Sequence, residues 1–183
     1  MEISAIIVTA LCIPAYYWAM RYNMHMFQLN GYKNGEHIRW IKKNLRQQWI
    51  LYYGFVLGIL TAVFRHVALD VTAILSLLLI IAVYRALKRL NVKKKLVFTD
   101  RVKRMIVTNL IVTLGLLVCT GVFLGVDRLA GAALCLVSVQ FFFNIISNII
   151  NSPIEKSINR YYINDARKKL KACSHIKVIG VTG

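Results

Sequence analysis

Charged residues are scarce in this sequence, and acidic residues are the scarcest of them. Only 17% of the 183 residues are charged, with 7 Asp and Glu against 24 Lys and Arg. Soluble domains carry about a quarter charged residues, so this chain has too little polar surface to cover a soluble globule. Its hydrophobic residues, 58% of the total, gather in long blocks that are typical of membrane-spanning helices.

The shortage of acidic residues leaves a formal net charge of +17. In a soluble protein that charge would indicate a nucleic-acid partner. Here the basic residues lie between apolar blocks, so they indicate anionic lipid headgroups and topology signals instead. We therefore expect the lipid bilayer, and no nucleic acid, as the partner of these residues.

The sequence also lacks the residue groupings that hydrolytic, redox and metal sites need. No C-x-x-C pair occurs, the apolar blocks contain no paired carboxylates, and the histidines are scattered. We therefore predict no catalytic residue, no metal ligand and no proton relay, and we expect the histidines at the surface or at an interface. The cysteines are Cys12, Cys119, Cys135 and Cys173, and the histidines are His25, His37, His66 and His175.

Five apolar blocks predict an all-α polytopic membrane protein with five transmembrane helices. Each block is near the roughly 20 residues that cross a hydrocarbon core of about 30 Å. The blocks are Ile3–Met20, Trp49–Phe64, Val67–Tyr84, Ile106–Val126 and Leu129–Ile150. The connections Arg65-His66 and Asp127-Arg128 are short enough to predict two tight helical hairpins. Asp70, near the start of the third block, is expected at the outer interface, where it stays solvated.

Basic residues alternate between the connections and predict the topology. The stretch from Arg21 to Gln48 carries six, the stretch from Arg85 to Met105 nine and the tail after Ile150 seven, whereas each hairpin carries one. The positive-inside rule places the rich segments in the cytoplasm. We therefore predict an outside N-terminus and a cytoplasmic C-terminus. The absence of basic residues before the first block also argues against a cleaved signal peptide.

The first basic connection contains a candidate amphipathic helix over Gly31–Arg46. Ile38, Ile41 and Leu45 recur at helical spacing, with basic residues between them. This pattern predicts a helix that lies on the cytoplasmic leaflet. A solvated loop is the alternative interpretation.

Two kinds of helix face stand out inside the blocks. Small residues recur every four positions, which allows close helix packing; they are Gly54, Gly58 and Ala62 in the second block and Gly121 and Gly125 in the fourth. Amides line one face of the fifth block at Gln140, Asn144, Asn148 and Asn151, with Ser147 beside them. Amides within a membrane need hydrogen-bond partners, so this face predicts either a helix–helix contact or a polar track for a substrate or lipid headgroup.

The tail changes character after the fifth block and defines two further segments. Pro153 is expected at the first turn of a charged cytoplasmic linker helix over residues 153–175. A β-branched run over residues 176–181 then leads into Gly180, Thr182 and Gly183, and so predicts a strand followed by a glycine turn. Backbone amides of such a turn can bind phosphate, although a plain β-turn explains the pattern equally well.

The last seven residues, Lys-Val-Ile-Gly-Val-Thr-Gly at 177–183, resemble the strand and the opening of the ATP loop in Mur ligases. The pattern of that loop is G-x-T-G-[ST]-x-G-K-[ST]. Pro153–Lys156 and Asn159–Ala166 are similar to the linker of a membrane-anchored subgroup, in which several N-terminal spans precede a cytoplasmic ligase of the MurF type. Gln28–Tyr32, followed by Arg39-Trp40, is similar to the first cytoplasmic loop of that subgroup.

This resemblance implies the N-terminal fragment of a larger enzyme of the bacterial cytoplasmic membrane. Mur ligases use ATP and Mg²⁺ to phosphorylate a substrate carboxylate, and an amine then attacks the acyl phosphate. The MurF type joins D-alanyl-D-alanine to a UDP-muramoyl tripeptide in peptidoglycan precursor synthesis. Only Gly180, Thr182 and Gly183 match the ATP loop, so we expect the 183 residues alone to be inactive and to bind no cofactor. A complete small membrane protein, a lipid-binding or transporter accessory subunit, is the alternative.

Overall fold

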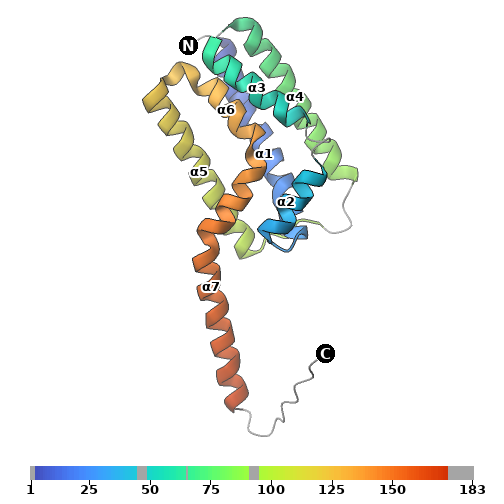
Figure 1. Ribbon diagram of the computed structural model, residues 1–183, viewed down its shortest axis with the longest axis vertical. Helices are drawn as coiled ribbons and strands as arrows, with labels where there is room; N and C mark the ends of the chain where they lie inside the picture. Colours follow the sequence, from blue (N-terminus) through green and yellow to red (C-terminus); the bar gives the residue numbers. More distant parts are fainter. Residues whose placement is uncertain (1–2, 45–48, 65, 91–94, 173–183) are drawn as a thin grey trace.

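The computed structural model describes residues 3–44, 49–64, 66–90 and 95–172, and every regular element within them is a helix (Figure 1). Three helices are long and apolar enough to cross a membrane, namely α1, α5 and residues 68–86 of α4. A bent pair formed by η2–α6 and α7 gives a fourth candidate span. In chain order the elements are α1 (Ile3–Leu29), α2 (Asn34–Lys43), α3 (Trp49–Phe64), α4 (Val67–Leu90), α5 (Asp100–Leu124), η2 (Val126–Arg128), α6 (Leu129–Ser138) and α7 (Gln140–Ala172).

The predicted spans are helical, although several boundaries differ from the prediction. The second block coincides with α3, a helix of 16 residues that is short for a span. The first block continues to Leu29 because Met24 and Phe27 bury themselves against Val102 and Met105 of α5. The number of spans observed by length and composition is thus three, or four with the bent pair, and five remains a prediction.

The fifth predicted span, Leu129–Ile150, is helical on both sides of a break and is not one continuous helix. The chain bends by 74° between η2–α6 and α7. Two backbone hydrogen bonds flank the bend: the Val139 amide donates to the Cys135 carbonyl at 3.0 Å, and the Phe142 amide donates to the Val139 carbonyl at 3.0 Å. Such a break is tolerated in a membrane domain where protein covers it, and Ser138 and Gln140 are both buried.

The central helix of the domain is α1, which packs against α4, α6 and α7 (Figure 1). Its inward positions Val8, Cys12, Ala15 and Ala19 recur every three to four residues and are almost completely buried. Alanines at the centre of this stripe let the neighbouring helices approach closely. The main apolar core therefore lies around α1.

Glycines bring α3 and α6 into direct backbone contact. A Cβ added to Gly131 would lie 2.5 Å from the Gly58 carbonyl oxygen and 2.6 Å from the Ala62 amide nitrogen. A Cβ added to Gly58 would lie 2.8 Å from the Gly131 carbonyl oxygen. The predicted packing role of the small-residue face on α3 is therefore confirmed, and Gly131 is its counterpart.

The small-residue face predicted for the fourth block has a different outcome. A Cβ on Gly121 would touch only the Leu129 side chain within 4 Å, at 3.6 and 3.9 Å, among the described residues. Gly125 has φ +96° and ends α5, with nothing near it. Gly125 therefore serves the tight connection through η2, because only glycine enters that backbone region readily.

The linker helix does not begin at Pro153, so that prediction was wrong. Pro153 lies inside α7, which runs unbroken for 33 residues. A proline lacks an amide donor and removes one hydrogen bond of the helix, but contacts of α7 on both sides of it hold the helical path. Figure 1 shows α7 leaving the other helices and extending well beyond them. The predicted strand over residues 176–181 lies outside the described part of the chain.

The amphipathic helix predicted for the first connection exists as α2. Only part of its apolar side faces outward: Ile38 is exposed, whereas Ile41 is buried and Trp40 packs against Tyr22 of α1 with ring centres 6.2 Å apart. The described basic residues of α2 are exposed at Arg39, Lys42 and Lys43. The helix is thus attached to the helical domain, and its contact with lipid remains a prediction.

Candidate functional site

The amide face of the fifth block forms a polar seam with α1 and α5. The Asn23 amide nitrogen of α1 donates to the Gln140 side-chain oxygen at 2.8 Å. The Asn109 amide nitrogen of α5 donates to the Asn144 oxygen at 3.1 Å, and the Tyr16 hydroxyl donates to the Asn109 oxygen at 2.9 Å. These five side chains are buried or nearly so. Of the two predicted roles for this face, the helix–helix contact is confirmed.

Several buried donors in the same region remain unsatisfied by protein. The Nδ2 atom of Asn144, the Nε2 atom of Gln140 and the Oγ atom of Ser147 have no hydrogen-bond partner among the described residues. All three lie on successive turns of α7. Buried polar atoms of this kind are typically satisfied by ordered water, so the seam has spare donors next to its interhelical bonds.

Two further predicted amides connect α7 to α5, to α2 and to the turn before α2. Asn151 donates to the Thr108 hydroxyl of α5 at 2.9 Å. Asn148 donates to the Asn34 side-chain oxygen at 2.9 Å and to the Tyr32 carbonyl at 3.2 Å, and it accepts from Arg101 at 3.0 Å. Arg101 also lies over the Tyr32 ring, 4.3 Å from its centre. One asparagine thus ties α7 to α2, to the preceding turn and to α5.

Glu155 completes this group one turn beyond Asn151. The Arg104 guanidinium donates to one Glu155 oxygen through Nη2 at 2.6 Å and through Nε at 3.1 Å. Arg101 Nε lies 3.9 Å from the other oxygen. The Glu155 side chain is only 13% exposed, so solvent screens this pair less than a surface ion pair. We call the group Tyr32, Asn34, Arg101, Arg104, Asn148 and Glu155 the junction cluster.

The turn before α2 is shaped to reach the junction cluster. Gly31 and Tyr32 both have positive φ, of 62° and 59°, and this conformation is uncommon for a residue other than glycine. The hydrogen bond from Asn148 to the Tyr32 carbonyl and the contact of Arg101 with the Tyr32 ring offset the free-energy cost of this conformation. Gln28 braces the turn from the other side, donating to the Val97 carbonyl at 3.0 Å and accepting from its amide at 3.1 Å.

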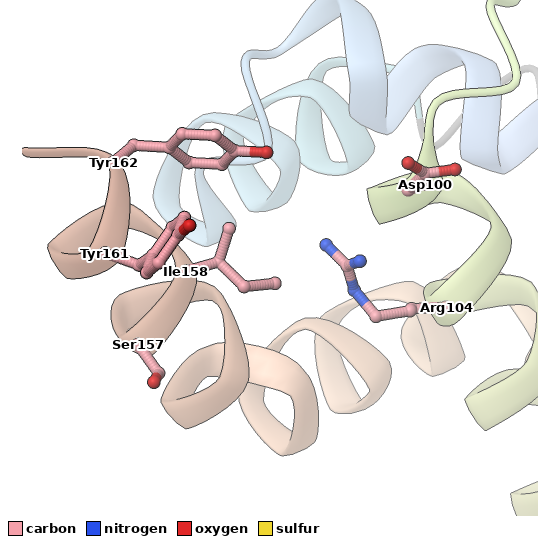
Figure 2. Close-up of a pocket in the computed structure, with 6 residues that line it drawn as sticks. All are labelled: Asp100, Arg104, Ser157, Ile158, Tyr161 and Tyr162. Atoms are coloured by element: carbon pink, nitrogen blue, oxygen red, sulfur yellow. The ribbon is translucent and has the colours of Figure 1, made fainter. Parts of the chain in front are cut away.

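A cavity of about 440 Å³ lies beside the junction cluster, between the start of α5 and the exposed half of α7 (Figure 2). Arg104 from α5 and Ile158 and Tyr162 from α7 point toward one another across it. Its lining comprises Asp100, Arg104, Ser157, Ile158, Tyr161 and Tyr162. The sequence showed these residues only as parts of a charged connection and a charged helix, because their proximity depends on α7 continuing through Pro153.

Asp70, which was expected to stay solvated at the outer interface, and His37, which was expected at a surface or at an interface, are both buried by protein. Asp70 is only 6% exposed, because the Ser4 hydroxyl of α1 donates to its carboxylate at 2.5 Å. His37 of α2 is fully buried between Phe27 and Trp40, whose ring centres lie 4.8 and 5.6 Å from its own. Burial lowers the pKa of His37 to about 4, and the backbone of Phe141 opposes part of that shift. His37 is therefore neutral in the folded protein at neutral pH.

The residues predicted to begin the ATP loop, Gly180, Thr182 and Gly183, lie outside the described residues. Over the described ranges, no three His, Cys, Asp or Glu side chains are grouped so that they could hold a metal ion. The candidate functional features of the described residues are thus the polar seam, the junction cluster and the cavity beside it. No protein-family model, curated protein or solved structure matches the chain.

Proposed function

We propose that these residues form the membrane-anchoring region of an ATP-dependent amide ligase of the Mur type, in the bacterial cytoplasmic membrane. The observation that carries the proposal is α7. It begins in the buried core at Gln140 and continues to Ala172 without interruption. From Pro153 onward it covers about 30 Å at 1.5 Å per residue, and most of that length is exposed.

Such a helix is suited to carry a following domain at a defined distance from the membrane. Its apolar part ends near Ile150, and the next 22 residues carry six Lys and Arg, which favours the cytoplasmic side. The junction cluster holds the base of the helix from α2 and α5, so its direction is set by the membrane domain. A freely jointed linker would need none of these contacts.

The kind of domain is inferred from the resemblance of residues 177–183 to a Mur-ligase ATP loop. The charge pattern assigns that segment to the cytoplasm, which is the compartment that holds ATP. In the intact enzyme, a lysine that follows the glycines would add a full charge to the phosphate site, and a hydroxyl would hold Mg²⁺. The expected substrates are a UDP-muramoyl tripeptide and D-alanyl-D-alanine.

The accessory-protein alternative was suggested mainly by the amide face of the fifth block. In the structure those amides bind neighbouring helices, and their remaining donors at Gln140 and Asn144 are buried, so they are poorly placed to reach a substrate or headgroup. We therefore favour the anchoring function over that alternative.

Sequencing the gene beyond Gly183 tests the proposal directly. We expect a continuation that reads x-G-K-[ST] within a few residues and then enters a helix. A continuation without that Gly-Lys pair would refute the ligase. The longer gene product should form ADP and the ligated peptide when given ATP, Mg²⁺ and both substrates, and a version without residues 1–152 should keep that activity but lose membrane association.

A further inference from the structure

The cavity beside the junction cluster lies at the depth of lipid headgroups if α5 spans the bilayer. At 25 residues α5 is about 37 Å long, whereas the hydrocarbon core is about 30 Å thick. The charged first turns, Asp100 to Arg104, therefore stand at the interface. Tyr161 and Tyr162 line the same cavity from α7, and tyrosine favours that depth.

The chemistry of the lining suits a phosphate ester. A guanidinium has five N–H donors and binds phosphate well, and the two bonds to Glu155 use only two of the five donors of Arg104. Ser157, Tyr161 and Tyr162 add three hydroxyl groups, and Ile158 adds an apolar wall. The volume of about 440 Å³ falls within the range of roughly 300–1,000 Å³ that is usual for small-molecule sites.

Two carboxylates oppose an anion, Asp100 in the lining of the cavity and Glu155 beside it, and each has a basic partner. Asp100 is paired with Lys103 at 3.1 Å on the exposed first turn of α5. Glu155 is paired with Arg104 and lies near Arg101. A phosphate would compete with the Glu155 carboxylate for Arg104, so Glu155 lowers the affinity of the cavity for phosphate.

We propose that this cavity binds the phosphate ester of a membrane-lipid headgroup, with Arg104 as the principal donor. The proposal goes beyond the anchoring function and does not require that a ligase follows. It gives the junction cluster a second role, because a headgroup on Arg104 would loosen the pair that holds α7 to α5.

The test uses the 183-residue protein in neutral detergent, with binding measured by isothermal titration calorimetry. The probes are a short-chain phosphatidylglycerol, the matching phosphatidylcholine and inorganic phosphate. We expect phosphatidylglycerol to bind more tightly than phosphatidylcholine. Binding of inorganic phosphate with the same dependence on Arg104 would assign the site to phosphate in general, and its absence would assign the site to the lipid.

Three variants separate a built site from general charge attraction. Arg104→Gln should weaken phosphatidylglycerol binding roughly tenfold or more, as expected for the loss of a charge-assisted hydrogen bond. Glu155→Gln should strengthen it, because the competing carboxylate is removed while the side-chain size is kept. Arg167→Gln, on the exposed end of α7, makes the same charge change as Arg104→Gln and should leave binding unchanged.

Equal losses of phosphatidylglycerol affinity in the Arg104 and Arg167 variants would overturn the proposal. Weaker binding by Glu155→Gln would also overturn it, as would the absence of detectable binding by the original protein. If Arg104→Gln does not fold, Ser157→Trp provides an independent test. It fills the cavity from an exposed position and leaves the Arg104–Glu155 pair in place. It should abolish binding, and unchanged binding would place the lipid elsewhere.

Discussion

The contact between α3 and α6 allows a sharp prediction, because it brings backbone against backbone. In Gly131→Ala, the new methyl group would lie 2.5 to 2.7 Å from the Gly58 carbonyl oxygen, the Ala62 amide nitrogen and the Ala62 Cβ. Optimal separations between such atoms are about 3.5–4.0 Å, so the two helices must move apart by roughly 1 Å. Overpacking of this kind costs about 1–3 kcal/mol. We expect α3 and α6 to lose close contact.

Gly115→Ala on α5 is the matched control. Gly115 also lies inside a helix, but a Cβ there meets nothing within 4 Å among the described residues. Alanine improves helix propensity by about 1 kcal/mol over glycine, and that gain is common to both variants. The difference between the two unfolding free energies therefore isolates the overpacking, and we expect Gly131→Ala to be less stable by about 1–3 kcal/mol.

The measurement is reversible unfolding in mixed micelles, with sodium dodecyl sulfate titrated into neutral detergent and helicity followed by circular dichroism. Gly131→Ala should unfold at a lower fraction of dodecyl sulfate than the original protein, whereas Gly115→Ala should unfold at the same or a higher fraction. Coincident transitions for the two variants would show that α3 and α6 do not meet through Gly131.

Three further outcomes follow from the charge pattern, the polar seam and His37. Reporter fusions after Arg65, Lys94, Asp127 and Lys171 should report outside and inside in turn. An inside signal at both hairpins, Arg65 and Asp127, would exclude the five-span topology. Asn144→Ala should cost about 0.6–1.7 kcal/mol, the range of interhelical hydrogen bonds in membranes; a double-mutant cycle with Asn109→Ala measures the coupling, and additive losses would contradict the bond. The pKa of His37 is lowered to about 4 from an ordinary value near 6.5, so as the pH falls the unfolded chain protonates this histidine before the folded protein does. The free energy of unfolding should therefore be constant above about pH 6.5 and fall between about pH 6.5 and 4. His37→Gln should show a smaller fall over the same pH range.

Much of the helical content could be predicted from the sequence, because apolar block length is a direct physical requirement of a bilayer. The bounds of α3 match its block, and α1 and α4 begin where their blocks begin. The failures occur where tertiary contacts override local signals. The bend before Gln140 interrupts an apolar run that reads as one helix, and Pro153 is carried through α7 although proline usually marks a helix start.

Of the candidate site, only the residues on α7 could be predicted from the sequence. The amides of α7 stand out because their spacing places them on one face of an apolar helix. Their partners Asn23, Asn109 and Arg101 have no such pattern, since each is a single polar residue on another element. Asp70 illustrates the same limit: the burial of this isolated carboxylate could not be predicted, because its partner Ser4 lies 66 positions away and belongs to no pattern.

The lengths of the helices also bear on the lipid around the protein. At 1.5 Å per residue, α1 and α5 are about 40 and 37 Å long, whereas α3 and α6 are about 24 and 15 Å long. The two short helices pack against each other, but α6 continues across the bend into the apolar start of α7, whereas α3 ends at Phe64 after 16 residues. If α3 spans a bilayer, its length of about 24 Å falls short of a hydrocarbon core of about 30 Å. The acyl chains beside α3 would then have to thin locally, at a cost of a fraction of a kcal/mol per Å of mismatch.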